Sequence, residues 1–139
     1  MNAINVCDAA YLAGLIDADG TVTLTRKHRY ENRHAAVSIS NTDKNLLKFV
    51  AGTIGAGEIT GKRIVRSNHC LSFVFSIYNR QALLLLECVY PFLHTYKARR
   101  AEIMLRDYLA LTPRNGKYTD EMRLARRAFE DEVLAIKPG

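Results

Sequence analysis

Small and apolar positions near the start of the chain recur at helical spacing. Asp8 is a good N-cap for a helix that runs from about residue 9 to residue 18. Small residues occupy one column of this predicted helix: Ala10, Gly14 and Ala18. A column without bulky side chains lets a second helix backbone approach closely. The pattern therefore predicts a helix with a surface suited to pairing with another helix.

After Gly20 the apolar positions change from a helical to an alternating pattern. Val22 and Leu24 point to one side of a predicted strand, and threonines point to the other. The same reasoning predicts the remaining elements: a strand at 35–40, a helix from Asn41 or Thr42 to about 53, a hairpin of 58–66 and 70–78, and helices at 80–90, 96–111 and from 120. This order predicts an α+β fold, in which a four-stranded antiparallel sheet carries helices on one face.

The predicted organisation is a single domain that covers residues 1–139, with a core at about 8–113 and a C-terminal helical extension at 114–139. The last predicted helix has an apolar stripe: Met122, Ala125, Phe129, Val133 and Ile136. The helix before it is expected to carry basic residues at its beginning and on its exposed faces: Lys97, Arg99, Arg100 and Arg106.

The chain is basic, with a formal net charge of +6 and a pI of about 9.4. A basic chain of this size indicates a polyanionic partner, and nucleic acid before a membrane. The three cysteines are far apart and form no C-x-x-C pair, which argues against a disulfide framework or a zinc site. We expect no signal peptide and no membrane span, because the longest apolar run, 82–86, is too short.

Polar residues on the outer face of the predicted sheet form a candidate DNA-binding surface. They are Thr23, Thr25, Lys27 and Arg29 on the first strand, His34, Ser38 and Ser40 on the second, Glu58, Thr60, Lys62 and Arg66 on the third, and Ser72 on the fourth. Lys and Arg neutralise phosphates, and Ser, Thr and His hydrogen-bond to phosphates or base edges. A solvated sheet face is the alternative, but residues 21–40 hold four basic residues against only Glu31.

Two carboxylates fall at the C-terminal end of the first predicted helix. Asp17 and Asp19 there face the negative end of the helix dipole, which is unfavourable by about 0.3 kcal/mol or more. A bound cation would offset this cost. An ordinary Asp-Gly turn ending at Gly20 is the alternative interpretation.

The segment Leu12–Gly20, Leu-Ala-Gly-Leu-Ile-Asp-Ala-Asp-Gly, resembles without a mismatch the name-giving motif of the LAGLIDADG homing endonucleases. The αββαββα core of that family also matches the predicted order of elements over about residues 8–113. The resemblance implies the homing-endonuclease fold with a saddle-like sheet. Because the chain carries one copy of the motif, it resembles the single-motif subgroup, whose members form symmetric homodimers.

The resemblance implies a metal site and a dimer interface on the motif helix. Asp19 and the backbone carbonyl of Ala18 match the ligands of the catalytic divalent metal. The implied metal is Mg²⁺; Mn²⁺ or Ca²⁺ can occupy the same site, and Ca²⁺ is expected to be non-catalytic. The implied interface residues are Ala10, Tyr11, Ala13, Gly14, Asp17 and Ala18.

Two further active-site positions follow from the same resemblance. Asn41 matches the polar residue that lines the family's active site, although Gln is more usual there. Lys97 matches the basic residue that assists catalysis, and the spacing from Pro91 leaves Arg99 or Arg100 as alternatives.

The function implied by the resemblance is that of a site-specific DNA endonuclease. Such a homodimer binds a long pseudo-palindromic duplex and hydrolyses both strands across the minor groove, which leaves 3′ overhangs. The alternatives are an intron RNA maturase with intron RNA as partner, a cleavage-inactive DNA-binding protein, and a basic dimeric interaction protein. The expected location is intracellular, either in an organelle (chloroplast or mitochondrion) or in a prokaryotic cytoplasm.

Overall fold

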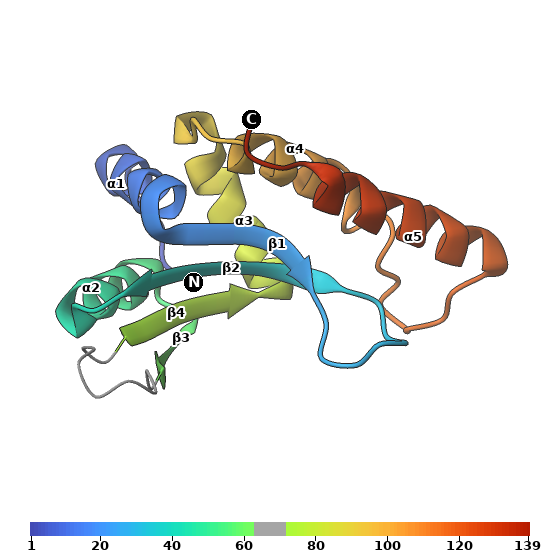
Figure 1. Ribbon diagram of the computed structural model, residues 1–139, viewed down its shortest axis with the longest axis horizontal. Coiled ribbons are helices and arrows are strands. Elements are labelled where there is room, and N and C mark those ends of the chain that lie inside the picture. The colour runs from blue at the N-terminus through green and yellow to red at the C-terminus, as the bar shows by residue number, and fades with distance from the viewer. Residues whose placement is uncertain (63–71) are drawn as a thin grey trace.

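The structure is a computed structural model that describes residues 1–62 and 72–139. Helices and strands follow the chain in the order shown in Figure 1: α1 (Val6–Asp19), β1 (Gly20–Thr25), β2 (His34–Asn41), α2 (Lys44–Ile54), β3 (Glu58–Lys62), β4 (Ser72–Tyr78), α3 (Asn79–Val89), the 3-10 turn η1 (Tyr90–Phe92), α4 (Lys97–Asp107) and α5 (Asp120–Ala135). The predicted order of elements is confirmed. The middle of the predicted hairpin lies outside the described residues.

The strands form one antiparallel sheet in the order β1-β2-β4-β3. The predicted alternation along β1 is confirmed, because Val22 and Leu24 are each 1% exposed. On the other face Thr21 lies opposite Ser38, which in turn lies opposite Ser76 of β4. The sheet therefore has an apolar inner face and an outer face rich in hydroxyl side chains.

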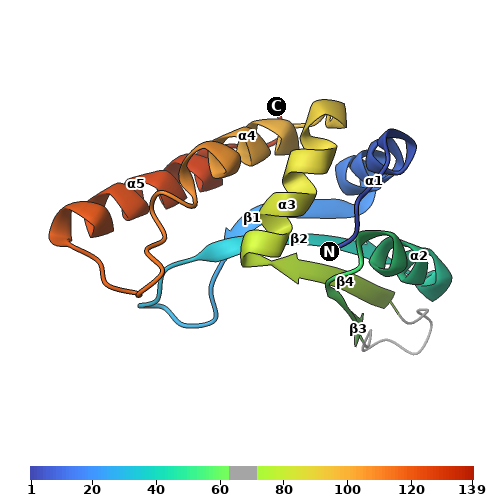
Figure 2. The ribbon, with the colours of Figure 1, turned by 180° about the vertical axis from the view of Figure 1, so that it is seen from behind.

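The helices cover the inner face of the sheet and leave the outer face open. Seen from behind, α3 crosses in front of the strands (Figure 2), whereas no helix lies in front of them in Figure 1. Leu12 and Ile16 of α1 and Leu86 of α3 are fully buried with Ile39 and Phe75 of the strands in one core. This arrangement confirms the predicted α+β fold. In the described residues, no helix is long and apolar enough to cross a membrane.

The C-terminal helix α5 packs into this same core through Phe129 and Val133, which are 4% and 0% exposed. The predicted apolar stripe is wrong at Ala125, which is exposed, because Arg126 takes the buried position beside it. The Arg126 guanidinium is only 2% exposed and lies 4.7 Å from the centre of the Tyr108 ring.

Each of the three guanidinium nitrogens of Arg126 has at least one acceptor. Its nitrogens donate to the backbone carbonyls of Leu111 and Arg33, to the Thr112 hydroxyl and to the Glu130 carboxylate. A buried arginine is tolerated when its fork of donors is satisfied in this way. Arg126 therefore joins α5 to the chain segments that lead out of β1 and α4.

Three predicted element boundaries are wrong. The N-cap of α1 is Asn5, whose side-chain oxygen accepts from the backbone N–H of Asp8 at 2.8 Å. The N-cap of α2 is Asp43, because Asn41 is still paired with Phe73 in the sheet. Helix α4 covers Lys97–Asp107 and not 96–111, with Tyr108, which is buried in the core, as its C-cap. Its hydroxyl binds the side chain of Asn79 and the backbone N–H of Ala35.

Gly20 separates α1 from β1, as predicted, but its role is to permit close contact. Its φ of −109° is accessible to any residue. A Cβ atom there would lie 2.6 Å from the Cα of Ile16 and 2.9 Å from the carbonyl oxygen of Ser38. The strand can therefore leave the helix directly against β2 only when this position has no side chain.

Candidate active site

The C-terminal end of α1 lies beside the end of β2, and this contact brings Asp19 and Asn41 together. The Nδ2 amide nitrogen of Asn41 donates to the Oδ2 carboxylate oxygen of Asp19 at 3.4 Å. The side-chain oxygen of the same Asn41 accepts from the backbone N–H of Asp43 at 2.8 Å. Because its oxygen is held by Asp43, the amide of Asn41 is oriented with its N–H groups toward the Asp19 carboxylate.

Lys97 lies at the same end of α1, but its position differs from the prediction. Its side chain was expected at an exposed helix start, whereas the residue is only 7% exposed. The Nζ ammonium donates to the carbonyl oxygens of Ile16 at 2.8 Å and Asp17 at 3.0 Å. The Asp17 carbonyl is among those that the last turn of a helix leaves without partners, and the Ile16 carbonyl also accepts from the backbone N–H of Gly20. Lys97 thus places a positive charge at the negative end of the α1 dipole and offsets the cost of the acids there.

Arg100, which was also expected on an exposed face, is 7% exposed. Its guanidinium donates to the backbone carbonyls of Ile136 and Val22. It therefore fastens the end of α5 to β1. Arg99 forms an exposed ion pair with Glu102. Of the three predicted alternatives Lys97, Arg99 and Arg100, only Lys97 therefore binds the end of α1.

Two residues link α1 to the start of α4: Asp17 of α1 binds the residues just before α4, and Lys97 of α4 binds the end of α1. The Asp17 carboxylate accepts from the backbone N–H of His94, from the backbone N–H of Thr95 and from the Thr95 hydroxyl at 2.6 Å. Lys97 in turn binds the last carbonyls of α1. We call Asp17, Thr95 and Lys97 the helix clasp. It fixes the start of α4 against the end of the motif helix, next to Asp19.

The clasp also affects the ionisation of its members. Partial burial of Asp17 would raise the pKa of its carboxyl group, but the hydrogen bonds from Thr95 and His94 outweigh burial and lower the pKa below its ordinary value of 3.8. Desolvation lowers the pKa of Lys97, against the attraction of the Asp17 and Asp19 carboxylates. The clasp therefore favours a charged Asp17.

We predict that Asp17→Asn lowers the free energy of unfolding at neutral pH by about 1.5 kcal/mol, the scale of a hydrogen bond to a charged group. Because the folded pKa of Asp17 lies below the unfolded one, this stabilisation is present above pH 3.8 and is lost as the pH falls through the folded pKa. Urea unfolding in metal-free buffer across this range measures the difference.

Two variants of Thr95 provide the control. Thr95→Val removes the hydroxyl donor to Asp17 and should lose part of the same stabilisation, while Thr95→Ser keeps the donor and should behave like the parent. An Asp17→Asn variant with the same pH dependence of unfolding as the parent would show that Asp17 makes no net contribution.

The donors at the end of α1 suit a hard divalent cation such as Mg²⁺. Asp19 and Ala18 are both exposed, and Lys97 binds the carbonyls of the two residues before Ala18. Carboxylate and carbonyl oxygens are the ligands that Mg²⁺ prefers, and Mg²⁺ keeps several waters when a protein supplies few ligands. Within residues 1–62 and 72–139, no three His, Cys, Asp or Glu side chains of one chain gather into a metal site.

The outer face of the sheet carries most of the predicted DNA-contact residues. By strand register they are Thr23, Thr25, His34, Ser38, Ser40, Glu58, Thr60 and Ser72. The backbone of Lys62 pairs with Ser72, and Arg66 lies outside the described residues. A hollow of about 550 Å³ at one end of this face is lined in part by Thr25, His34 and Glu58.

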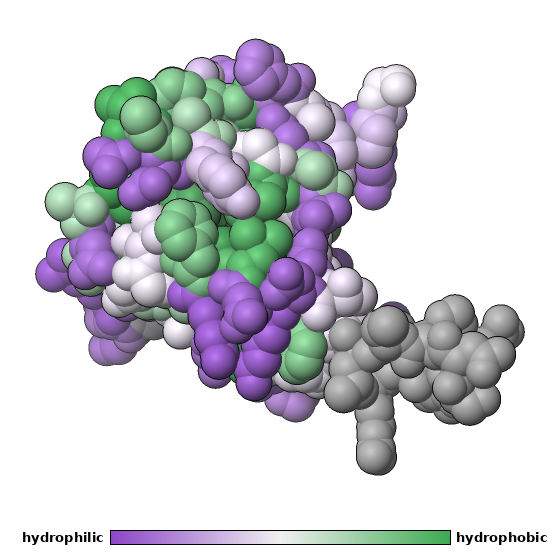
Figure 3. All heavy atoms as spheres, turned by 90° about the vertical axis from the view of Figure 1, so that its left-hand side faces the viewer, coloured by the Kyte–Doolittle hydropathy of each residue, from purple (hydrophilic) through white to green (hydrophobic). Residues whose placement is uncertain are grey.

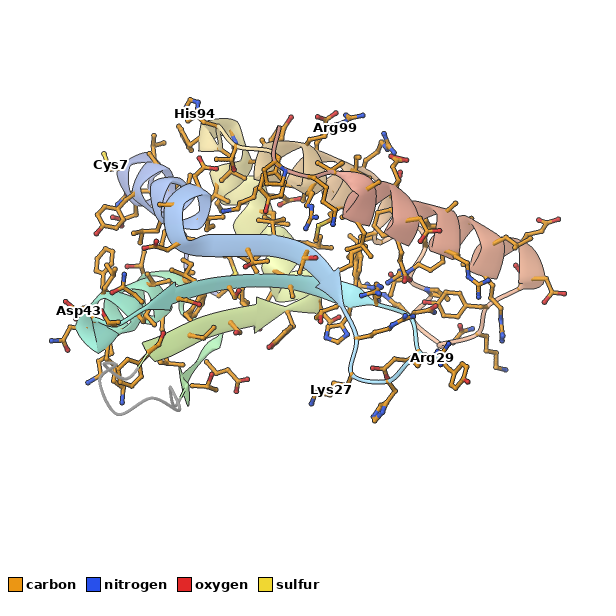
Figure 4. All side chains as sticks on the ribbon, in the orientation of Figure 1. Cys7, Lys27, Arg29, Asp43, His94 and Arg99 are labelled. Atoms are coloured by element: carbon orange, nitrogen blue, oxygen red, sulfur yellow. The ribbon has the colours of Figure 1, made fainter. Side chains whose placement is uncertain are left out.

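Lys27 and Arg29 were predicted on the first strand, but they lie beyond its end. They belong to the loop of residues 26–33 between β1 and β2, where Figure 4 shows Lys27 pointing away from the helices and Arg29 lying nearer the α5 side. The sequence pattern continues past Thr25, but the antiparallel pairing of β1 with β2 stops there, at His34. The described strands are therefore mainly neutral and hydroxyl-rich, and the positive charge is concentrated in the loop.

The small-residue column of α1 faces outward. Ala10, Gly14 and Ala18 are exposed, and a Cβ atom added to Gly14 would meet nothing within 4 Å. Tyr11 is 51% exposed and contacts Phe49 of α2, with ring centres 5.7 Å apart. In Figure 3 apolar residues gather on the face that α1 and α2 present.

Two residues predicted at the dimer interface are engaged within their own chain. Ala13 is 0% exposed and packs in the core, so its side chain cannot reach a partner, and the prediction is wrong for this residue. Asp17 is partly buried in the helix clasp. Ala13 does not belong to the column of Ala10, Gly14 and Ala18. It lies on the inner side of α1, where Leu12 and Ile16 also pack in the core.

The residues that support the site were not found from the sequence. Asp43 orients Asn41, and Thr95 binds Asp17 across 78 residues of chain. The bond between Thr95 and Asp17 is long-range and leaves no periodic signal in the sequence. The bond between Asp43 and Asn41 is local, with the geometry of an Asx turn, and the turn-forming residues of this segment are its only sequence signal.

Comparison with known proteins supports the identification of the motif. A family model described as LAGLIDADG-like domain matches residues 7–84. No curated protein sequence matches the chain.

Solved structures resemble the chain over nearly its whole length. The homing endonuclease I-CvuI, in complex with its target and in the presence of calcium, has 20% identity and a TM-score of 0.75, with 96% of this chain and 84% of that chain covered. An archaeal intron-encoded homing endonuclease, I-Vdi141I, complexed with DNA, has 17% identity and a TM-score of 0.71, with 93% and 83% covered. The meganuclease I-SmaMI, bound to uncleaveable DNA, has 17% identity and a TM-score of 0.68, and this chain covers 44% of it.

At these identities the structural matches establish the shared fold. The family model covers more than half of the chain and includes the motif, the four strands β1–β4 and Asn41. The protein therefore belongs to the family of LAGLIDADG-like domains.

Proposed function

We propose that this protein is a site-specific DNA endonuclease that acts as a homodimer with a divalent metal. The observation that carries the proposal is the contact of Asp19 with Asn41 at the end of the motif helix, where Lys97 binds the neighbouring carbonyls, next to an open sheet face. An acid, an amide donor and a cation are what hydrolysis of a phosphodiester needs close together. The structurally similar proteins I-CvuI and I-Vdi141I are described as homing endonucleases in complex with DNA, which is consistent with this proposal.

The outer face of the sheet is the proposed DNA-binding surface. Its hydroxyl groups can hydrogen-bond to base edges and phosphates, and the loop of residues 26–33 adds Arg26, Lys27 and Arg29 to neutralise phosphates. A strand of six residues such as β1 spans about 20 Å, or about six base pairs of duplex. One chain therefore contacts a half-site, and two related by a two-fold axis contact a long pseudo-palindromic target.

The proposed dimer forms through the exposed column of α1. A single chain offers one Asp19, so a centre that cuts both strands needs a second copy beside it. The 139 residues hold one such fold unit, since they cover 84% of I-CvuI but 44% of I-SmaMI. Close crossing of two α1 helices at Gly14 and Ala18 would bring the two Asp19 side chains together.

Each residue at the site has a proposed task. Asp19 and the Ala18 carbonyl would hold Mg²⁺, which when bound polarises the phosphate and makes a water molecule more acidic. The Asn41 amide holds the Asp19 carboxylate in one orientation through its N–H group. Lys97 contributes a positive charge beside the reacting phosphate while it fixes the end of α1. Cleavage across the minor groove with 3′ overhangs belongs to the same proposal.

A pair of Asn41 variants tests whether the amide donor takes part. Asn41→Asp keeps the oxygen that accepts from Asp43 and loses the donor to Asp19, whereas Asn41→Ala loses both. We expect both variants to cleave about 10–100-fold more slowly, the effect of losing a partner that orients a metal ligand. Asn41→Asp also places a second carboxylate beside Asp19, so thermal unfolding should show a loss of stability from charge repulsion in Asn41→Asp and from the lost bonds in Asn41→Ala. Cleavage by both variants at the parental rate would remove Asn41 from the site.

A maturase is the second candidate function, because the same fold could bind a structured intron RNA. A binding competition separates the two, with a labelled DNA target and unlabelled intron RNA or DNA duplex. Stronger competition by the RNA, together with no cleavage of any duplex in Mg²⁺, would favour the maturase.

A further inference from the structure

A basic cleft lies between the β1–β2 loop and α5, apart from the sheet face. Its volume is about 630 Å³. Five arginines line it: Arg26, Arg29 and Arg33 from the loop, and Arg123 and Arg127 from α5. Tyr30, which is 94% exposed, and Tyr118 add two phenol groups. Elements from the two ends of the chain thus build one positively charged recess.

Four of these arginines have no partner within the described chain. In residues 1–62 and 72–139, no ion pair or side-chain hydrogen bond is formed by Arg26, Arg29, Arg123 or Arg127. Arg123 and Arg127 are spaced four residues apart on the exposed side of α5, where like charges destabilise a helix. Such an uncompensated cluster is expected to bind an anion.

Two of the three acids in the cleft are already engaged. The Glu31 carboxylate accepts from the backbone N–H groups of Lys27 and His28, and these bonds lower its pKa below the usual range. Glu130 is bonded to Arg126 and to the backbone N–H of Arg33. Asp131 remains as the third acid. Glu31 keeps its negative charge, because backbone N–H groups do not neutralise it, but the four unpaired arginines still outnumber Glu31 and Asp131.

The cleft continues the DNA-binding surface beyond the end of the sheet. Asp19 precedes β1, and the loop that forms the cleft follows it, so the cleft lies about 20 Å or more from the acidic site along the strand. The buried Arg126 holds the loop and α5 in place through the backbone carbonyls of Arg33 and Leu111. The recess is thus a fixed part of the fold.

We infer that this cleft binds backbone phosphates of duplex DNA just outside the half-site covered by the sheet. Arginine forks and tyrosine hydroxyls suit phosphate oxygens, and such contacts position a protein without reading sequence. The inference rests on the proposed DNA-binding function and adds α5 to the binding surface. The cleft then fixes the register of the protein on its target and does not contribute to sequence recognition.

The test is a salt titration of duplex binding by charge variants on α5. Arg123→Gln and Arg127→Gln should each reduce the slope of log K against log salt by about 0.9, and the double variant by about 1.8. Arg127→Lys keeps the charge and should keep most of the slope. Arg99→Gln is the matched control, because Arg99 is exposed on the opposite side of the molecule from Arg29 (Figure 4).

Target length provides a second readout that folding alone would not change. When the outer ends of a selected target are shortened stepwise, the parent should lose affinity at the step that removes the flanking phosphates, and the double variant should not. An unchanged salt slope and the same length dependence in the double variant would overturn the inference, even if the parent cleaves DNA. Tighter arginine-dependent binding of structured RNA than of duplex would also overturn it. Absence of any duplex binding by the parent would instead contradict the proposed function.

Discussion

Asp19→Asn is expected to reduce the rate of duplex cleavage in Mg²⁺ by more than about 100-fold, because residues that merely support a metal ligand already account for about 10–100-fold. Asp19 is exposed at the end of α1, and its side chain contacts Asn41 at 3.4 Å without entering the core. Folding and duplex binding of the Asp19→Asn variant should therefore stay close to those of the parent. Single-turnover cleavage and a gel-shift assay measure the two effects separately.

Asp8→Asn provides a control of the same chemistry on the same helix. Asp8 lies in the first turn of α1, where its charge interacts favourably with the helix dipole and is far from the site. Its replacement should lower stability slightly and leave cleavage unchanged. If Asp19→Asn unfolds the protein or abolishes binding together with cleavage, Asp19 has a structural role and the assignment fails.

Gly14→Leu is expected to convert the dimer into a monomer and to abolish double-strand cleavage. Gly14 lies in the exposed column of α1, and its position is open in the single chain. Leucine therefore fits the isolated subunit and raises helix propensity by up to about 1 kcal/mol. In the proposed dimer the same side chain would push the two helices apart. Sedimentation velocity and thermal unfolding together measure the loss of the dimer without loss of the fold.

Gly52→Leu is the matched control for this substitution. Gly52 is also exposed on a helix, a Cβ atom there also meets nothing within 4 Å, and its carbonyl accepts from Asn2 of the same chain. This variant should remain dimeric and active. A Gly14→Leu protein that sediments as the parent does would place the interface elsewhere.

The fold was largely predictable because periodic patterns determine it. The alternation of Val22 and Leu24 and the spacing of the core residues in α3 follow directly from burial on one face. Element ends were less predictable, since Asn41 is retained in the sheet by its pairing with Phe73, a contact between distant segments. The burial of Arg126 and Lys97 could not be predicted for the same reason, because backbone carbonyls of distant segments accept their hydrogen bonds.

The candidate site was predictable only where the family resemblance assigns residues. Asp19 and Ala18 come from the motif, and Asn41 and Lys97 come from matches outside it; the structure brings Asp19 and Asn41 into contact. The helix clasp could not be predicted, because it joins Asp17 to Thr95 through the tertiary fold. The clasp also explains how two acids are tolerated at the end of α1, since Lys97 supplies a cation from within the chain itself.

The most direct test of the central claim is a cleavage selection on a randomised duplex library in Mg²⁺, performed with the parent and with Asp19→Asn. We expect the parent to enrich a long, roughly palindromic sequence cut on both strands, and Asp19→Asn to retain that sequence by binding without producing cut ends. Failure of the parent to cut any sequence, or equal cutting by Asp19→Asn, would contradict the account.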